Sequence, residues 1–240
     1  MKIEWRTVTW YSKAIALGLF VLLPFFGFWF GAGYGAARQY AADAFALSTA
    51  AKPSSSASGL PAYYQNTAEW QTDRNFSGGA SIAYPIDFAT TDNYNPKPIA
   101  NWRQGTPGGP GVQLFRLTIP KAFEPQTNFS DAVLTVGMSA DPAAVAQCLV
   151  PEPTYRPQPT STVDINGVPF TVFHFSDVGA GNLYDTTSYR TVRSGSCWAV
   201  EYTIHSAQLG NYPSSYGLRQ FDAAKLRDVL DRIVGTFTLN

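Results

Sequence analysis

Residues 197–205 read CWAVEYTIH, and this stretch decides the fold of the C-terminal part of the chain. Apolar and polar side chains alternate along it, which is typical of a β-strand with one buried face. The side chains expected inside are those of Trp198, Val200, Tyr202 and Ile204. Glu201, Thr203 and His205 then lie on the opposite face of the same strand.

The segments before this strand repeat the pattern. DING at 164–167 is a turn signal that leads into VPFTVFHF at 168–175, and SYRTVR occupies 188–193. Such runs, separated by glycine-containing turns, predict an antiparallel meander. Further upstream, alternating apolar residues predict strands over 112–120 and 132–138, and GASIAYP at 79–85 predicts a short one.

Two helices are expected beside the sheet. Asp141 followed by Pro142 predicts a short helix that ends near Cys148, because a capping carboxylate and a first-turn proline both favour a helix start. Asp222 caps a second helix that ends at Gly235. Its apolar stripe consists of Leu226, Val229, Leu230, Ile233 and Val234. The predicted fold class is therefore α+β, with an antiparallel sheet covered by helices.

The N-terminal part has a different character. Residues 14–37 are uncharged and lie between Lys13 and Arg38. As a helix they would extend roughly 36 Å, enough to cross a hydrocarbon core of about 30 Å. Basic residues before the segment favour a cytosolic N-terminus. We therefore expect a single-pass cell-membrane protein with its C-terminal domain outside the cytoplasm and the lipid bilayer as a partner.

This division predicts four parts. They are a cytosolic N-terminus at 1–13, a transmembrane helix at 14–37, an Ala- and Ser-rich linker at 38–62, and one exported domain at 63–240. A cleaved signal peptide is the alternative, since Ala42 and Ala44 form a small-residue cleavage pattern. The apolar run is longer than a signal core, which favours the uncleaved anchor, but the sequence leaves the cleavage question open.

Glycines recur at every fourth position within the apolar segment. Gly27, Gly31 and Gly35 would place three bare backbone patches on one helix face, which favours close association with a second helix. The chain could then self-associate or serve as an accessory subunit of a membrane complex. Glycine is also common in membrane helices for other reasons.

Composition and charge exclude one class of partner. The chain has 240 residues, and the part beyond the linker is long enough for one domain with its own core. From Gln39 onward there are 13 Lys and Arg against 16 Asp and Glu. A slightly acidic body argues against nucleic-acid binding, which needs a basic face.

The two cysteines, Cys148 and Cys197, both follow the apolar segment. In an oxidising compartment we expect them to pair. A free catalytic thiol is the alternative, but no base lies near either cysteine in the sequence.

No stretch matches a catalytic or cofactor motif. The glycine-rich GTPGGPG at 105–111 is followed by a strand rather than a helix, so we interpret it as a flexible loop and not as a phosphate cradle. His174, Glu201 and His205 are weak candidates: if their strands were neighbours, the imidazoles and a carboxylate could form a metal or acid–base site. The spacing matches no known pattern, so we predict no metal and no cofactor.

Taken together, the residues favour a tethered binding or envelope-associated module without catalytic activity, whose partner is an envelope protein or a glycan. An enzyme acting on envelope polymers is the alternative, with those three weak candidates to test. Aromatic faces accompanied by Asn and Ser, as at 184–189 and 211–216, can bind sugars or peptides, but such tyrosines more often cover a sheet.

Several of these segments together carry a family resemblance. The anchor opening at 5–31, NFSDAVLTVGMSAD at 128–141 and the block at 174–205 resemble uncharacterised membrane-anchored exported proteins of candidate-phylum bacteria. Their bodies are similar to PsbP-like α+β domains, with an antiparallel sheet covered by helices. The resemblance implies that Cys148 and Cys197 pair. It implies no activity, and no functional residue is carried over from it.

Overall fold

The computed structural model describes residues 10–26, 61–73, 79–90, 97–105, 107–151 and 160–239. The chain divides into two compact units, residues 1–51 and 52–240, which are described separately.

In the first unit, residues 10–26 form a helix. Its apolar side chains are exposed, with Phe20 at 78% and Phe25 at 70% of their full accessible surface. The helix includes the first half of the apolar stretch at 14–37. Residues 27–37, with Gly27, Gly31 and Gly35, lie outside the described residues, as does the linker up to residue 60. Within the described ranges, none of the helices has both the length and the hydropathy that a membrane crossing requires.

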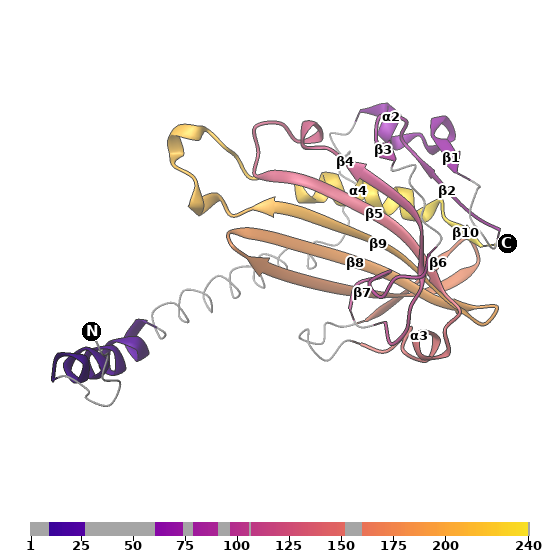
Figure 1. Cartoon of the computed structure of the whole chain (residues 1–240). Coiled ribbons are helices and arrows are strands. Elements are labelled where there is room, and N and C mark those ends of the chain that lie inside the picture. The colour runs from indigo at the N-terminus through magenta and orange to yellow at the C-terminus, as the bar shows by residue number, and fades with distance from the viewer. Residues whose placement is uncertain are drawn as a thin grey trace. The chain divides into compact units, whose positions relative to one another are not determined.

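The second unit is built on a seven-stranded antiparallel sheet (Figure 1). In spatial order its strands are β3 (Ala89–Thr90), β4 (Val112–Ile119), β5 (Phe129–Ser139), β9 (Ser196–Ala207), β8 (Asn182–Arg193), β7 (Val168–Gly179) and β6 (Ser161–Ile165). A smaller sheet contains β1 (Gln71–Asp73), β2 (Ala80–Tyr84) and β10 (Thr238–Leu239). The predicted strands at 79–85, 112–120 and 132–138 are confirmed.

The predicted meander is also confirmed, and tight hairpins explain it. Asn166–Gly167, Ala180–Gly181 and Ser194–Gly195 join β6 to β7, β7 to β8 and β8 to β9. Both residues of each pair have positive φ. Two-residue turns of this kind match the twist of antiparallel strands and hold their register.

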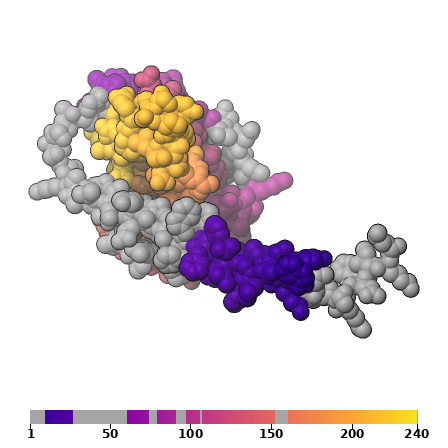
Figure 2. Space-filling view, turned by 90° about the vertical axis from the view of Figure 1, so that its left-hand side faces the viewer, coloured from indigo at the N-terminus to yellow at the C-terminus, as the bar shows by residue number. Residues whose placement is uncertain are grey.

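One face of the large sheet is covered by α4 (Ala223–Gly235), and the main hydrophobic core lies between them. The Asp222 side chain accepts a hydrogen bond from the Lys225 N–H, which confirms the predicted cap. All five residues of the predicted stripe are buried. Trp198, Val200, Tyr202 and Ile204 face this core, as the alternation at 197–205 predicts. In the space-filling view, the C-terminal segment, in yellow, forms the outer surface of this unit on that side (Figure 2).

The opposite face, here called the open face, is covered only in part by the residues that the structure describes. The short helix α3 (Pro142–Ala146) lies against β9, and the Asp141 side chain accepts hydrogen bonds from its first N–H groups. Cys148, which follows α3, forms a disulfide with Cys197 of β9, with an S–S distance of 2.03 Å. The predicted pairing is confirmed.

The remaining helices are single turns. They are α2 (Ala62–Gln65), η1 (Thr67–Glu69), η2 (Lys121–Phe123), η3 (Leu209–Asn211) and η4 (Ser214–Tyr216). The α+β class and the antiparallel sheet are therefore confirmed. In the described part of the second unit, however, α4 is the only helix longer than five residues, so helical cover is confined largely to one face.

Candidate functional site

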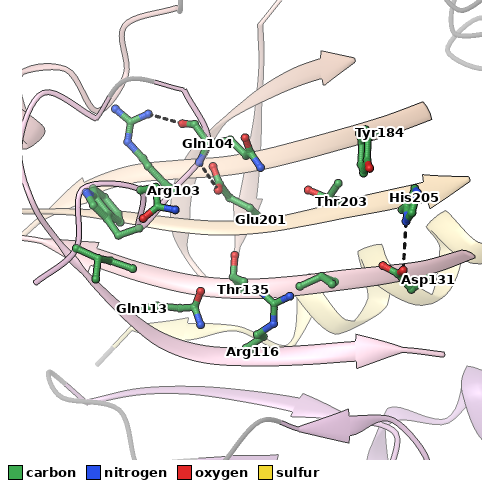
Figure 3. A pocket seen from close by; sticks show the side chains of 14 residues that line it. Arg103, Gln104, Gln113, Arg116, Asp131, Thr135, Tyr184, Glu201, Thr203 and His205 are labelled. Atoms are coloured by element: carbon green, nitrogen blue, oxygen red, sulfur yellow. Dashed lines mark hydrogen bonds and ion pairs between the residues drawn. The ribbon is translucent and has the colours of Figure 1, made fainter. Parts of the chain in front are cut away.

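A groove with a volume of about 410 Å³ lies on the open face (Figure 3). This size is in the range of pockets that bind small molecules, about 300–1,000 Å³. The lining residues are Ile99, Asn101, Trp102, Arg103, Gln104, Gln113, Arg116, Asp131, Val133, Thr135, Tyr184, Glu201, Thr203 and His205. The first five come from one loop and the others from β4, β5, β8 and β9.

The strand register arranges the sheet residues in rows. Arg116 of β4 is opposite Thr135 of β5, which is opposite Glu201 of β9. Further along, Asp131 is opposite His205, which is opposite Tyr184 of β8. Four residues of extended strand separate the two rows, a distance of roughly 13 Å. The groove therefore runs along β5 and β9 from one row to the other.

The loop at 97–105 forms the wall of the groove at the Glu201 end. The Trp102 ring packs directly on Gly137 of β5, where an added Cβ would lie 2.7 Å from the Trp102 carbonyl oxygen and 2.8 Å from its ring. Ile99 forms a β-bridge with Gly111, with N···O distances of 2.7 and 3.0 Å. Gly109 packs on Asp141 and leaves no room for a side chain. The described residues of 105–111 are therefore held in place, unlike the flexible loop that the sequence suggested.

A buried polar network fixes this wall to the sheet. The Gln104 N–H donates to Glu201 Oε2 at 2.7 Å, and the Ser188 hydroxyl donates to Glu201 Oε1. Arg190 is fully buried; its Nε donates to Ser188 Oγ at 2.8 Å and its Nη2 to the Gln104 carbonyl at 3.0 Å. Nη2 also lies 3.6 Å from Glu201 Oε1. Glu201 is thus a structural acceptor that two strands and the loop share.

The Arg190 guanidinium is further enclosed by two aromatic rings of β7. It lies 4.6 Å from the centroid of Phe173 and 5.2 Å from that of Phe175. Contacts of a cation with a ring face are favourable, and more so away from water. The Arg190 guanidinium is therefore held in place both by these rings of the sheet and by the Gln104 carbonyl of the loop.

At the far end of the groove, His205 is held between two oxygen acceptors. Its Nδ1 lies 3.2 Å from Asp131 Oδ2, and its Nε2 lies 2.9 Å from Asn182 Oδ1. The imidazole stacks on Tyr184, with ring centroids 4.6 Å apart and planes 13° apart. This end of the groove therefore offers a fixed aromatic surface beside a carboxylate.

Arg116 differs from the other charged residues of the groove. It is half-buried between Gln113 and Thr135, and its side chain extends toward β5 (Figure 3). Within the described part of the chain, its guanidinium forms neither a hydrogen bond nor an ion pair. Glu201, two strands away in the same row, is already engaged by Arg190.

The structure separates His174 from the other two weak candidates. His174 lies on β7, where its Nδ1 is 3.2 Å from Thr187 Oγ1 of β8, and it is on the sheet face that α4 covers, near Arg227 and Asp231. His205 and Glu201 lie on the open face of β9, with β8 between β9 and β7. The two imidazoles therefore cannot share a metal ion. No group of three His, Cys, Asp or Glu side chains among the described residues is arranged to hold a metal.

His174 is expected to make the domain sensitive to acid. Burial lowers the pKa of this imidazole from its usual 6.5; Arg227 lowers it further, whereas Asp185 and Asp231 raise it. The unfolded chain therefore takes up the proton at a higher pH than the folded domain. The stability that this adds is present above about pH 6.5 and is lost as the pH falls through the lower folded pKa.

Replacing His174 with glutamine should thus make the urea midpoint depend less on pH than in the wild type between about pH 7 and pH 5. Because His205 remains in both proteins, the difference between the two slopes isolates His174. Equal slopes would show that His174 does not contribute.

Sequence reasoning missed most of the groove. It placed Glu201, Thr203 and His205 on one face, and the structure confirms this. Arg116 and Asp131 were not singled out, although Arg116 interrupts an apolar strand between Phe115 and Leu117. The alternation of polar and apolar residues indicated that both side chains lie on the polar face of their strands. Only the pairing of β4, β5 and β9 shows that they line the same groove.

Comparison of the sequence with models of known protein families and with curated proteins returns no match. The predicted relationship to PsbP-like domains stays a prediction.

Proposed function

We propose that this protein is a membrane-tethered, extracytoplasmic binding module that holds a small polar ligand in the groove of its open face and does not catalyse a reaction. The observation that carries the proposal is the groove itself. It is of ligand size, it is lined mainly by polar side chains, and both a disulfide and a buried ion pair brace the structure next to it. Pre-formed pockets with a few fixed polar groups are typical of ligand sites.

The ionisable side chains of the groove already contact other protein groups, which favours binding over catalysis. Both carboxylate oxygens of Glu201 accept hydrogen bonds from the protein. Both ring nitrogens of His205 are likewise in contact with protein oxygens. A general base must reach a substrate proton, and these side chains are committed to holding the walls of the groove.

The proposed tether rests on the apolar stretch at 14–37 and on the exposed apolar side chains of residues 10–26. Side chains such as Phe20 and Leu23 gain free energy when they leave water for an apolar environment. Retention of the full chain in membranes after alkaline washing, together with protease access from outside sealed cells, tests this part. Release of the intact chain would contradict it.

An arginine placed in the floor of the groove tests the binding function. The full chain in lipid nanodiscs is screened by ligand-observed NMR against neutral saccharides, acidic saccharides and small hydroxy acids. We expect Thr203→Arg to abolish the signals of any ligand that the wild type binds, because the long side chain fills the groove. Thr162→Arg, on the exposed edge strand β6, is the matched control and should keep them.

Thermal melting of both variants verifies that they fold. No binding by the wild type, or equal binding by the two variants, would overturn the proposal.

One observation favours the competing enzyme function. The contact between His205 and Asp131 has the form of a carboxylate that orients a histidine base. If this pair performed catalysis on an envelope polymer, His205→Ala would abolish turnover of that polymer while the melting temperature stayed unchanged. In the binding module the same variant weakens ligand binding, and no product forms with either protein.

A further inference from the structure

We infer that the groove is specific for an acidic saccharide, a ligand that carries a carboxylate on a hydroxylated ring. The inference rests on the proposed binding function and adds to it the chemical class of the ligand. It follows from the different chemistry of the two ends of the groove.

The Arg116 end favours an anion. The guanidinium is half-buried beside the groove, and its donors are not used within the described part of the chain. Guanidinium groups bind carboxylates through two parallel hydrogen bonds, which gives both strength and orientation. Thr135, in the same cross-strand row, and Gln113 add further polar groups at this end.

The Asp131 end favours hydroxyl groups and disfavours a second anion. The Asp131 side chain is 42% exposed, and one of its oxygens is in contact with His205. Its other oxygen forms no hydrogen bond within the described residues, so it can accept one from a ligand hydroxyl. A ligand carboxylate would be repelled here. The ligand is therefore oriented, with its acidic group on Arg116 and its hydroxyls toward Asp131.

An aromatic surface beside Asp131 suits a sugar ring. Tyr184 is 38% exposed and is held in place by stacking on His205. The C–H groups on one side of a pyranose ring form an apolar face that can pack on such a surface, while the hydroxyls around the ring remain available for hydrogen bonds. Val133 and Thr203 supply a floor of mixed polarity between the two ends.

Two matched disaccharides test the inference. Digalacturonate and α-1,4-galactobiose have the same linkage and differ in the carboxylates. Calorimetry with the full chain in nanodiscs should give binding of digalacturonate at least about tenfold tighter than that of galactobiose, the difference expected of one charge-assisted pair. The preference should shrink as salt is added, because the Arg116 site is partly open to solvent.

Arg116→Gln should remove the preference for digalacturonate and leave the affinity for galactobiose within about twofold, since the hydroxyl contacts remain. Arg193→Gln, at an exposed arginine in the hairpin between β8 and β9, is the matched control and should keep the preference. A preference that survives Arg116→Gln would overturn the inference. Equal competition by inorganic phosphate at the same concentration would also overturn it, because a site for simple anions does not need the sugar ring.

The outcomes separate this inference from the proposed function. If neither disaccharide binds but another ligand of the panel occupies the groove, the acidic-saccharide class is wrong and the binding function stands. If no ligand of the panel binds, the binding function itself is wrong.

Discussion

Replacing Glu201 with alanine is expected to lower the free energy of unfolding of the second unit by about 3–5 kcal/mol, the range found when one partner of a buried ion pair is removed. Glu201 is buried, and three groups share its carboxylate: the Ser188 hydroxyl, the Gln104 N–H and the Arg190 guanidinium. The variant deprives the buried Ser188 hydroxyl and the part-buried Gln104 N–H of their acceptor and removes the negative charge beside Arg190. Urea denaturation followed by far-UV circular dichroism measures the effect.

A double-mutant cycle supplies the control. In an Arg190→Met background the guanidinium is absent, so Glu201→Ala should cost at least about 1 kcal/mol less than it does in the wild type. An equal cost in both backgrounds would show that the two side chains are not coupled. The groove should respond as well, because Gln104 then loses the bond that ties the 97–105 wall to β9. Ligand affinity should therefore fall in the variant even under conditions in which it remains folded.

The second large effect is expected from the disulfide. Cys148 and Cys197 close a loop with a sequence separation of 49. Restricting the unfolded chain by a loop of this length is worth about 4 kcal/mol on the chain-entropy model. Reduction, or the double replacement Cys148→Ala and Cys197→Ala, should lower the free energy of unfolding by roughly that amount.

Loss of the disulfide should also weaken the wall of the groove, because the disulfide lies next to that wall. The bond connects the segment after α3 to β9, and Trp102 packs in the same small cluster as both cysteines. Arg103, next in the wall, donates to the carbonyl of Gln147, the residue before Cys148. Without the bond, what joins this segment to β9 among the described residues is the packing of that small cluster. We expect weaker ligand binding in the reduced protein at temperatures well below its melting point.

Comparison of the reduced wild type with the double-alanine variant separates the covalent effect from the loss of sulfur packing. The two should agree within about 1 kcal/mol, the cost of small changes in a packed core. A destabilisation below about 1 kcal/mol in both proteins would contradict the loop-closure argument.

The sequence predicts the elements of the second unit more completely than the groove. The stripe of α4, the alternation along β9 and the cap at Asp141 depend on neighbours within a few residues, and all three are confirmed. The groove depends on cross-strand register, which places Arg116, Thr135 and Glu201 in one row although they are far apart in the chain. It also depends on Gln104, which belongs to a loop without any periodicity. Local patterns carry no information about such a contact.

The two histidines differ in how well the sequence placed them. Alternation placed His205 on the polar face of β9 correctly. For His174 the deciding fact is that β8 lies between the two histidine strands, an order that the predicted meander already implies. The structure also places His174 on the sheet face that α4 covers, near Arg227 and Asp231 of that helix. The hypothesis of a shared metal site required the two histidine strands to be neighbours, and they are not.

Neighbouring positions of β9 serve different purposes, and this affects how the protein can change over evolutionary time. Val200, Tyr202 and Ile204 belong to the core, whereas Thr203 and His205 lie between or beside them and line the groove. A substitution at Thr203 therefore acts on the groove and on the hydrogen bond to Thr186 Oγ1, whereas a substitution one residue away acts on the core. A lineage can thus adopt a new ligand through a few exchanges at alternate residues and keep the same scaffold.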